Sequence, residues 1–140
     1  MPFTRDPYEV LSARMITTLA YGSLASALIH GIDYLILPQR DDVLSVAERA
    51  APVQAWGVLL LVATALTFAG RIVHRWPVTI IGHALLAGVF CALGVGALIG
   101  GVIDPAGDGF RDGAGYLGVQ TCVHLLLTRS AWRRWDSWRG

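Results

Sequence analysis

The sequence predicts an all-α integral membrane protein, a bundle of four transmembrane helices with both termini in the cytoplasm. Three observations lead to this fold class. The 140 residues are 54% hydrophobic and only 15% charged, with a mean hydropathy of +0.54, whereas soluble domains are about 45–50% apolar and about 25% charged. The apolar residues gather into long runs without charge, as membrane helices do. The loops between these runs differ in charge from one side of the predicted membrane to the other.

Four apolar runs follow one another along the chain and define the predicted helices. A bilayer core about 30 Å thick needs roughly 20 mostly apolar helical residues to cross it. The first run is interrupted by His30 and Asp33, the third contains no Asp, Glu, Lys or Arg, and the fourth is short and glycine-rich at its start. We therefore predict a single domain, residues 1–140, with spans at about 15–37, 53–73, 77–103 and 114–128 and an interfacial tail at 129–140.

A cleaved secretory signal peptide is the competing interpretation of the first run. Ala25-Ser26-Ala27 has the small-x-small form of a cleavage site. The apolar run continues beyond it to Leu37, and Asp6 and Glu9 dilute the positive charge that precedes a signal peptide. These features favour a retained membrane span.

The segments between the runs have the composition of turns. Residues 38–52 form a polar stretch between two prolines, and residues 71–77 form a short basic turn in which Pro77 is placed to begin the next helix. Residues 104–113 are rich in Pro, Gly and Asp, which indicates a turn between the last two spans. Short connections of this kind predict antiparallel neighbouring helices.

The distribution of arginine predicts the orientation. All 11 basic residues are Arg, and the side of a membrane protein with more Arg near the span ends is cytoplasmic. Most of the acidic residues lie on the side with fewer arginines. Eight arginines fall on the side of the termini, Arg5, Arg14, Arg71, Arg75, Arg129, Arg133, Arg134 and Arg139, and three on the other, Arg40, Arg49 and Arg111. We expect both termini to be cytoplasmic.

The third run carries a stripe of small residues at every fourth position. Small side chains let helix backbones approach closely, which is how helices associate in lipid. The stripe predicts tight packing, either against another helix of the same chain or against a second copy in a homo-oligomer. Its members are Ala84, Gly88, Ala92, Gly96 and Gly100.

Polar residues inside the predicted spans are candidate functional residues, because ionisable groups are rare there and often functional. His30 and Asp33 are three residues apart, so they share a face of the first helix near its outer end. They could relay protons or bind a cation, or satisfy each other at the headgroup level. His83 and His124 lie toward the cytoplasmic ends of their spans, with Gln120 one turn from His124. We expect the two histidines to lie at similar depth and to face each other.

These residues do not predict a cofactor, a metal site or an enzyme. Paired histidines on neighbouring membrane helices hold haem in some proteins, but the chain has no second pair and no CxxCH motif. Interhelical hydrogen bonds, worth on the order of 1 kcal/mol each, are the expected use of His83 and His124. No hydrolase motif, P-loop, dinucleotide fingerprint or zinc signature is present. The net charge of +1 does not favour nucleic-acid binding.

The tail combines tryptophan with arginine. Trp132, Trp135 and Trp138 are spaced by three, so on a helix they form an aromatic arc. Such a segment is expected to lie in the interface, with indole at headgroup depth and guanidinium groups on anionic lipid. It is either a topological anchor or a tail that senses or perturbs lipid. The arginines that lie mostly away from the arc are Arg129, Arg133 and Arg134.

Short motifs in the first half resemble a class of phage proteins. Gly31-Ile32-Asp33-Tyr34 precedes a proline, and Ala51-Pro52 and Trp56 open the second span. This layout resembles small four-span membrane proteins of actinobacterial phages, some of which are holins. The resemblance implies a multi-pass protein of the host cytoplasmic membrane whose partners are the lipid bilayer and other copies of itself.

Three functions remain open from the sequence. The first is a holin-like protein that oligomerises and permeabilises the membrane, for which a second start at Met15 could supply an inhibitor form. The second is a non-enzymatic membrane protein that acts through a partner protein, as an exclusion protein or accessory subunit. The third is a small proton-coupled transporter that uses Asp33 or His30.

Overall fold

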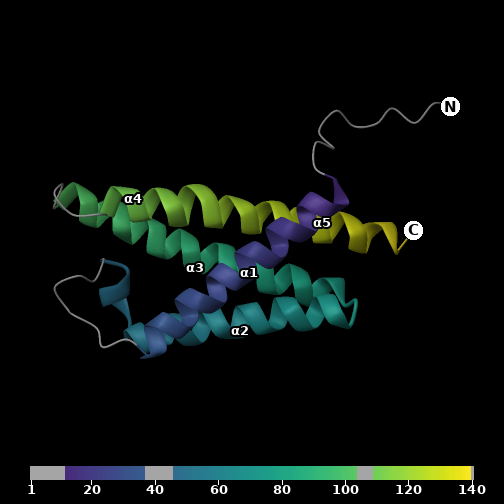
Figure 1. Ribbon diagram of the computed structural model, residues 1–140, viewed down its shortest axis with the longest axis horizontal. Coiled ribbons are helices and arrows are strands. Elements are labelled where there is room, and N and C mark those ends of the chain that lie inside the picture. The colour runs from purple at the N-terminus through teal and green to yellow at the C-terminus, as the bar shows by residue number, and fades with distance from the viewer. Residues whose placement is uncertain (1–11, 37–45, 104–108, 140) are drawn as a thin grey trace.

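The computed structural model describes residues 12–36, 46–103 and 109–139 and confirms an all-helical protein (Figure 1). Three long helices are α1 (Ala13–Ile36), α2 (Val53–Ile72) and α3 (Trp76–Ile103). A fourth rod is one continuous helical stretch, and a 3-10 turn, η1 (Glu48–Ala50), precedes α2. The fourth rod comprises α4 (Gly109–Gly113), the π-helical segment η2 (Ala114–Thr121) and α5 (Cys122–Ser137).

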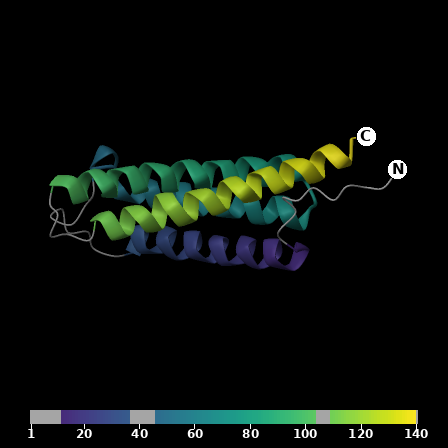
Figure 2. The same ribbon diagram turned by 90° about the horizontal axis from the view of Figure 1, so that it is seen from above.

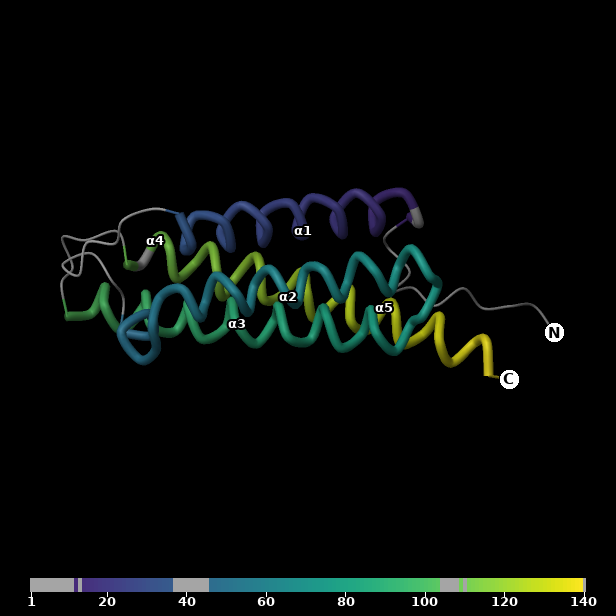
Figure 3. The backbone as a smooth tube through the Cα atoms, turned by 90° about the horizontal axis from the view of Figure 1, so that it is seen from below, coloured from purple at the N-terminus to yellow at the C-terminus, as the bar shows by residue number. Residues whose placement is uncertain are grey.

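The four rods run antiparallel in chain order, so the start of α1 and the end of α5 lie at the same end of the bundle (Figures 1 and 2). Helix α3 packs along α2 on one side and along the whole fourth rod on the other. Helix α1 lies across α2 and α5 (Figures 1 and 3). The turn between α2 and α3 contains His74, whose φ of 52° is left-handed. As the sequence predicts, Pro77 lies in the first turn of α3.

The bundle exposes many large apolar side chains and buries several polar ones, as expected of a membrane protein. Three helices, Arg14–Ile36, Val53–Ile72 and Trp76–Ile103, are long and apolar enough to cross a membrane, close to the first three predicted spans. Large apolar side chains on all four rods are exposed, whereas several polar side chains are buried. Hydrocarbon around the protein explains both. The buried polar residues are Ser23, Thr64, Thr67, Thr79, His83, Thr121 and His124.

The fourth rod differs from the sequence prediction at both ends. The predicted turn at 104–113 is shorter, because helix already begins at Gly109. The tail does not separate from the fourth span at Arg129, because α5 continues to Ser137. Between Asp112 and Arg129 the rod has 16 residues without Asp, Glu, Lys or Arg, or about 24 Å of helix at roughly 1.5 Å per residue. The uncharged part is thus shorter than a bilayer core of about 30 Å.

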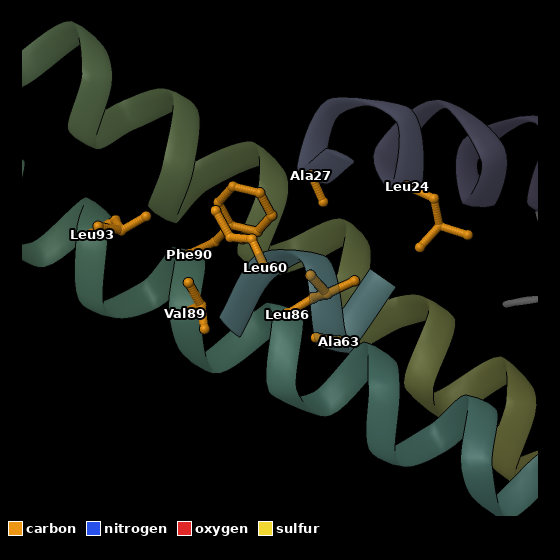
Figure 4. Packing of buried hydrophobic residues seen from close by; sticks show 8 residues of the cluster. All are labelled: Leu24, Ala27, Leu60, Ala63, Leu86, Val89, Phe90 and Leu93. Atoms are coloured by element: carbon orange, nitrogen blue, oxygen red, sulfur yellow. The ribbon is translucent and has the colours of Figure 1, made fainter. Parts of the chain in front are cut away.

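Apolar side chains of α1, α2 and α3 meet in one core cluster (Figure 4). Phe90 lies near its middle, with Tyr34, Trp56 and Tyr116 packed against its edge. Because lipid is as apolar as these side chains, the cluster stabilises the bundle by dense packing rather than by removal from water. Its members are Leu24, Ala27, Leu60, Ala63, Leu86, Val89, Phe90 and Leu93.

Glycines outside the predicted stripe bring the rods together. A Cβ at Gly57 would lie 2.8 Å from the carbonyl oxygen of Gly31, so α1 and α2 touch through their backbones. A Cβ at Gly82 would lie 2.7 Å from the backbone nitrogen of Thr67, and one at Gly94 equally close to that of Leu117. Rods that follow one another along the chain therefore approach at positions where only hydrogen fits.

We expect Gly82→Ala to destabilise the bundle, because the added methyl group meets the backbone of α2 and pushes the two helices apart. Overpacking of this kind costs about 1–3 kcal/mol. The free energy of unfolding, measured in mixed micelles with increasing denaturing detergent, should fall by that amount.

Gly88→Ala is the matched control on the same helix. A Cβ at Gly88 meets nothing within 4 Å, and alanine is the better helix former by up to about 1 kcal/mol. Its stability should stay equal or rise slightly. Equal stability loss in both variants would contradict a close approach of α2 and α3 at Gly82.

Candidate functional site: a column of histidine and aromatic rings

Two histidines meet in the interior of the bundle. His83 projects from α3 and His124 from α5, and both side chains are 0% exposed. Their Nδ1 atoms are 3.0 Å apart, a hydrogen-bond distance. The sequence prediction that these residues face each other is confirmed.

The hydrogen bond between the rings determines where their protons lie. A neutral imidazole carries one N–H, so one ring donates from Nδ1 and the other accepts at Nδ1. The donating ring then has a bare Nε2, and the accepting ring carries its proton on Nε2. Both Nε2 atoms are buried without a hydrogen-bond partner among the described residues, as is the Thr79 hydroxyl one turn before His83.

Phe90 continues the line of rings from this pair toward the other end of the bundle. It stacks on His124 with ring centroids 5.6 Å apart and an interplanar angle of 8°. Its ring also stacks with Tyr116 of η2 at 5.9 Å, and the edge of His30 from α1 meets both. We call the rings of His83, His124, Phe90, Tyr116 and His30 the ring column. It joins three of the four rods along the bundle interior.

Beyond His30 the ring column meets a hydrogen-bonded polar group. The Tyr34 hydroxyl donates to a carboxylate oxygen of Glu48 at 2.5 Å, and the Tyr116 phenol lies close enough to Tyr34 to act on it electrostatically. Asp33 and Asp112 lie close enough to act electrostatically on Tyr116. The 3-10 turn η1 thus places an acid from the loop against α1 and η2. The Glu48 carboxylate, the two tyrosine hydroxyls and the His30 imidazole form one cluster at this end of the bundle.

His30 and Asp33 lie differently, although three residues separate them. The His30 side chain is half-buried and contacts Phe90 and Tyr116, whereas the Asp33 side chain is exposed. Three residues rotate a helix by about 300°, so the two side chains lie about 60° apart. That angle allows one to face the bundle and the other to face outward.

Gln120 forms a hydrogen bond between two helices. Its Nε2 donates to the Ser26 hydroxyl at 2.9 Å, which joins η2 to α1. The segment η2 is π-helical, and within it the Thr121 hydroxyl donates to the Tyr116 carbonyl five residues back. Because a π turn holds more residues than an α turn, it changes the directions of Tyr116 and Gln120 relative to His124.

The predicted stripe on α3 lies largely on the outer face of the bundle. Ala84 and Gly88 are exposed, and Ala92 and Gly100 are half-buried. A Cβ at Gly88 or Gly100 would meet nothing within 4 Å. Gly96 is buried and packs against Ala47, which precedes η1.

The tail residues lie at the end of α5 as an aromatic and basic group. Trp132 and Trp135 meet edge to face at 5.2 Å, and Arg139 lies 4.9 Å over the Trp135 ring. Arg134 lies 5.4 Å over Trp76 at the start of α3. The remaining predicted tail residues, Arg129, Arg133 and Trp138, are exposed.

Sequence analysis missed four members of the ring column and its polar end: Phe90, Tyr116, Tyr34 and Glu48. Phe90 reads as one more apolar residue of a span, and Glu48 as part of a polar loop. No local pattern joins them, since α1, η1, α3 and η2 contribute one partner each. Among the described residues there is no group of three or more His, Cys, Asp or Glu that could hold a metal ion.

Fold and site together define a helical membrane protein with a polar and aromatic interior. No protein-family model, curated protein or solved structure matches the chain.

We expect His83→Leu and His124→Leu each to lower the free energy of unfolding in micelles, because each leaves the other imidazole buried without its partner. The double variant should lose less than the sum of the two. Hydrogen bonds between membrane helices give coupling energies of about 0.6 kcal/mol on average and about 1.7 kcal/mol at most. Strict additivity in this double-mutant cycle would contradict a hydrogen bond between the rings.

Proposed function

We propose that this chain is a non-enzymatic, holin-like protein that associates with copies of itself in a bacterial cytoplasmic membrane and permeabilises it. The observation that supports this most directly is the outward position of the stripe on α3. Ala84 and Gly88 are exposed, and no atom lies within 4 Å of a Cβ at Gly88. Without small residues there, a second helix could not come close.

Most of the stripe takes no part in the packing of the chain's own helices. The contacts between rods that exclude even a Cβ use glycines such as Gly31, Gly57, Gly82 and Gly94, none of which belongs to the stripe. Among the described residues, Gly96 is the stripe glycine whose Cβ position is blocked, by Ala47. Because these small residues do not pack inside the chain, they support the proposal that a helix of another chain packs against them. We propose that this helix belongs to a second copy.

The proposed topology has four spans and cytoplasmic termini. Arg14, Arg71, Arg75 and Arg134 belong to the end of the bundle where α1 begins and α5 ends, in agreement with the positive-inside rule. The fourth rod packs along α3, and it exposes apolar side chains such as Leu125 and Leu126 as a lipid-facing helix would. Tilt, local thinning of the bilayer or snorkelling of arginine accommodates its short uncharged length.

We expect Gly88→Leu to abolish self-association, because a branched side chain on the stripe holds a second helix away. In bacteria that express the protein from an inducible promoter, the variant should lose both chemical crosslinking into dimers and the abrupt collapse of membrane potential seen with a voltage-sensitive dye.

Gly22→Leu is the matched control for this experiment. Gly22 is an exposed glycine of α1 that also has open space around its Cβ position. Its variant should associate and depolarise like the wild type. Full depolarisation by the Gly88→Leu variant would refute the stripe as the self-association surface. Absence of depolarisation by the wild type, with a specific protein co-purifying, would instead favour the partner-binding alternative.

Cysteine labelling tests the fourth span. In a background with Cys91 and Cys122 replaced by alanine, Val46→Cys and Ser137→Cys each supply one exposed position at opposite ends of the bundle. With intact spheroplasts and a membrane-impermeant maleimide, the cysteine at 46 should react and the cysteine at 137 should not. Labelling at 137 before lysis would show that the fourth rod does not cross or that the orientation is reversed.

A further inference from the structure

We propose that the ring column conducts protons along the bundle, with the His83–His124 pair as the relay and Phe90 as the barrier that limits the rate. This inference needs the bundle to span the membrane, but it does not depend on self-association. It arises from two buried nitrogen atoms that the fold leaves without partners.

The relay rests on the two unpartnered Nε2 atoms. An unpaired polar group in an apolar interior is unfavourable. The pair nevertheless has a bare Nε2 on one ring and a protonated Nε2 on the other, and both atoms are buried. A proton acceptor on one side and a proton donor on the other are what a relay requires.

The transfer step is balanced without any redox partner. A proton from water forms an N–H bond at the bare Nε2 of the donating ring. The proton between the rings leaves that ring's Nδ1 and bonds to the Nδ1 of the other, whose Nε2–H bond breaks and releases a proton to water. One proton has crossed the pair, both rings are neutral again, and their tautomers are exchanged. Rotation of both rings then returns a bare nitrogen to the entry side and an N–H group to the exit side, so the next proton can pass in the same direction.

Titratable and hydroxyl groups lie at both ends of this relay. Toward the end where α2 begins, Tyr34 donates a hydrogen bond to Glu48 and Tyr116 lies near Tyr34. His30 contacts Tyr116. Toward the arginine-rich end, Thr79 lies one turn from His83 with an unpartnered hydroxyl. Arg71 acts on His83 electrostatically from α2 and lies over Tyr21 of α1.

Phe90 interrupts the path between these two groups. Its ring stacks with both His124 and Tyr116, and a hydrocarbon ring can neither donate nor accept a proton. Phe90 is also 0% exposed and belongs to the core cluster. Conduction therefore requires Phe90 to move or water to pass it, so the resting flux is low and a smaller side chain should raise it.

The experiment measures proton flux into liposomes that contain the purified full-length protein. A potassium gradient with valinomycin supplies the driving force, and entrapped pyranine reports the internal pH. We expect wild-type vesicles to change pH faster than protein-free vesicles, and Phe90→Ala to raise the flux several-fold. His83→Leu/His124→Leu should reduce the flux to the protein-free level, both alone and combined with Phe90→Ala.

Leu60→Ala is the matched control for the cavity. Leu60 is a fully buried residue of α2 in the same core cluster, so its truncation also opens space but beside the column rather than within it. Its flux should equal that of the wild type. Proton flux in the double-histidine variant, or an equal increase in the Leu60→Ala and Phe90→Ala vesicles, would overturn the proposal. If Phe90→Ala does not fold, the difference in proton flux between the wild type and the double-histidine variant still tests the proposal.

A second dye separates this activity from membrane permeabilisation. Liposomes loaded with carboxyfluorescein release it only through a lesion much wider than a proton path. The Gly88→Leu variant should release no carboxyfluorescein yet keep the proton flux of the wild type. Loss of both signals in that variant would assign the flux to the oligomeric lesion and overturn the relay.

Discussion

The close approach of α3 to its neighbours on both sides is the constraint on which the rest of this structure depends. Hydrocarbon supplies little force to press apolar helices together, so the bundle relies on contact between backbones. Gly82 against Thr67 and Gly94 against Leu117 set the spacing of α2, α3 and the fourth rod. At that spacing the side chains of His83 and His124 reach each other, and Phe90 fills the space beside them.

The interior that results combines an apolar core with buried polar side chains, whereas much of the surface is apolar. Exposed positions on every rod hold residues such as Leu59 and Leu125, while several threonines and two histidines turn inward. Hydroxyls of Thr67 and Thr128 are satisfied by carbonyls one turn back in their own helices. The imidazoles have no such local acceptor, so they pair across helices. Their two Nε2 atoms then have no hydrogen-bond partner among the described residues. This difference separates residues that stabilise the bundle from residues that can also act on a proton.

The two proposals use different faces of the same helix. The stripe through Ala84 and Gly88 faces outward, and His83 and Phe90 face inward. Because one face serves association and the other lines the interior, a substitution on one need not disturb the other. The helix can therefore carry both roles, and its unbroken length of 28 residues keeps their relative position constant.

The sequence by itself determined the helical class, three membrane-capable segments and the facing of His83 and His124, because apolar run length and distance from the arginine-rich ends are local quantities. Only the tertiary structure decided which glycines pack inside and that the stripe on α3 faces outward, since a spacing of four fixes a face but not its neighbour. It also decided that Glu48, Tyr34 and Tyr116 meet, because a loop acid and two tyrosines distant in sequence become partners only after the helices assemble.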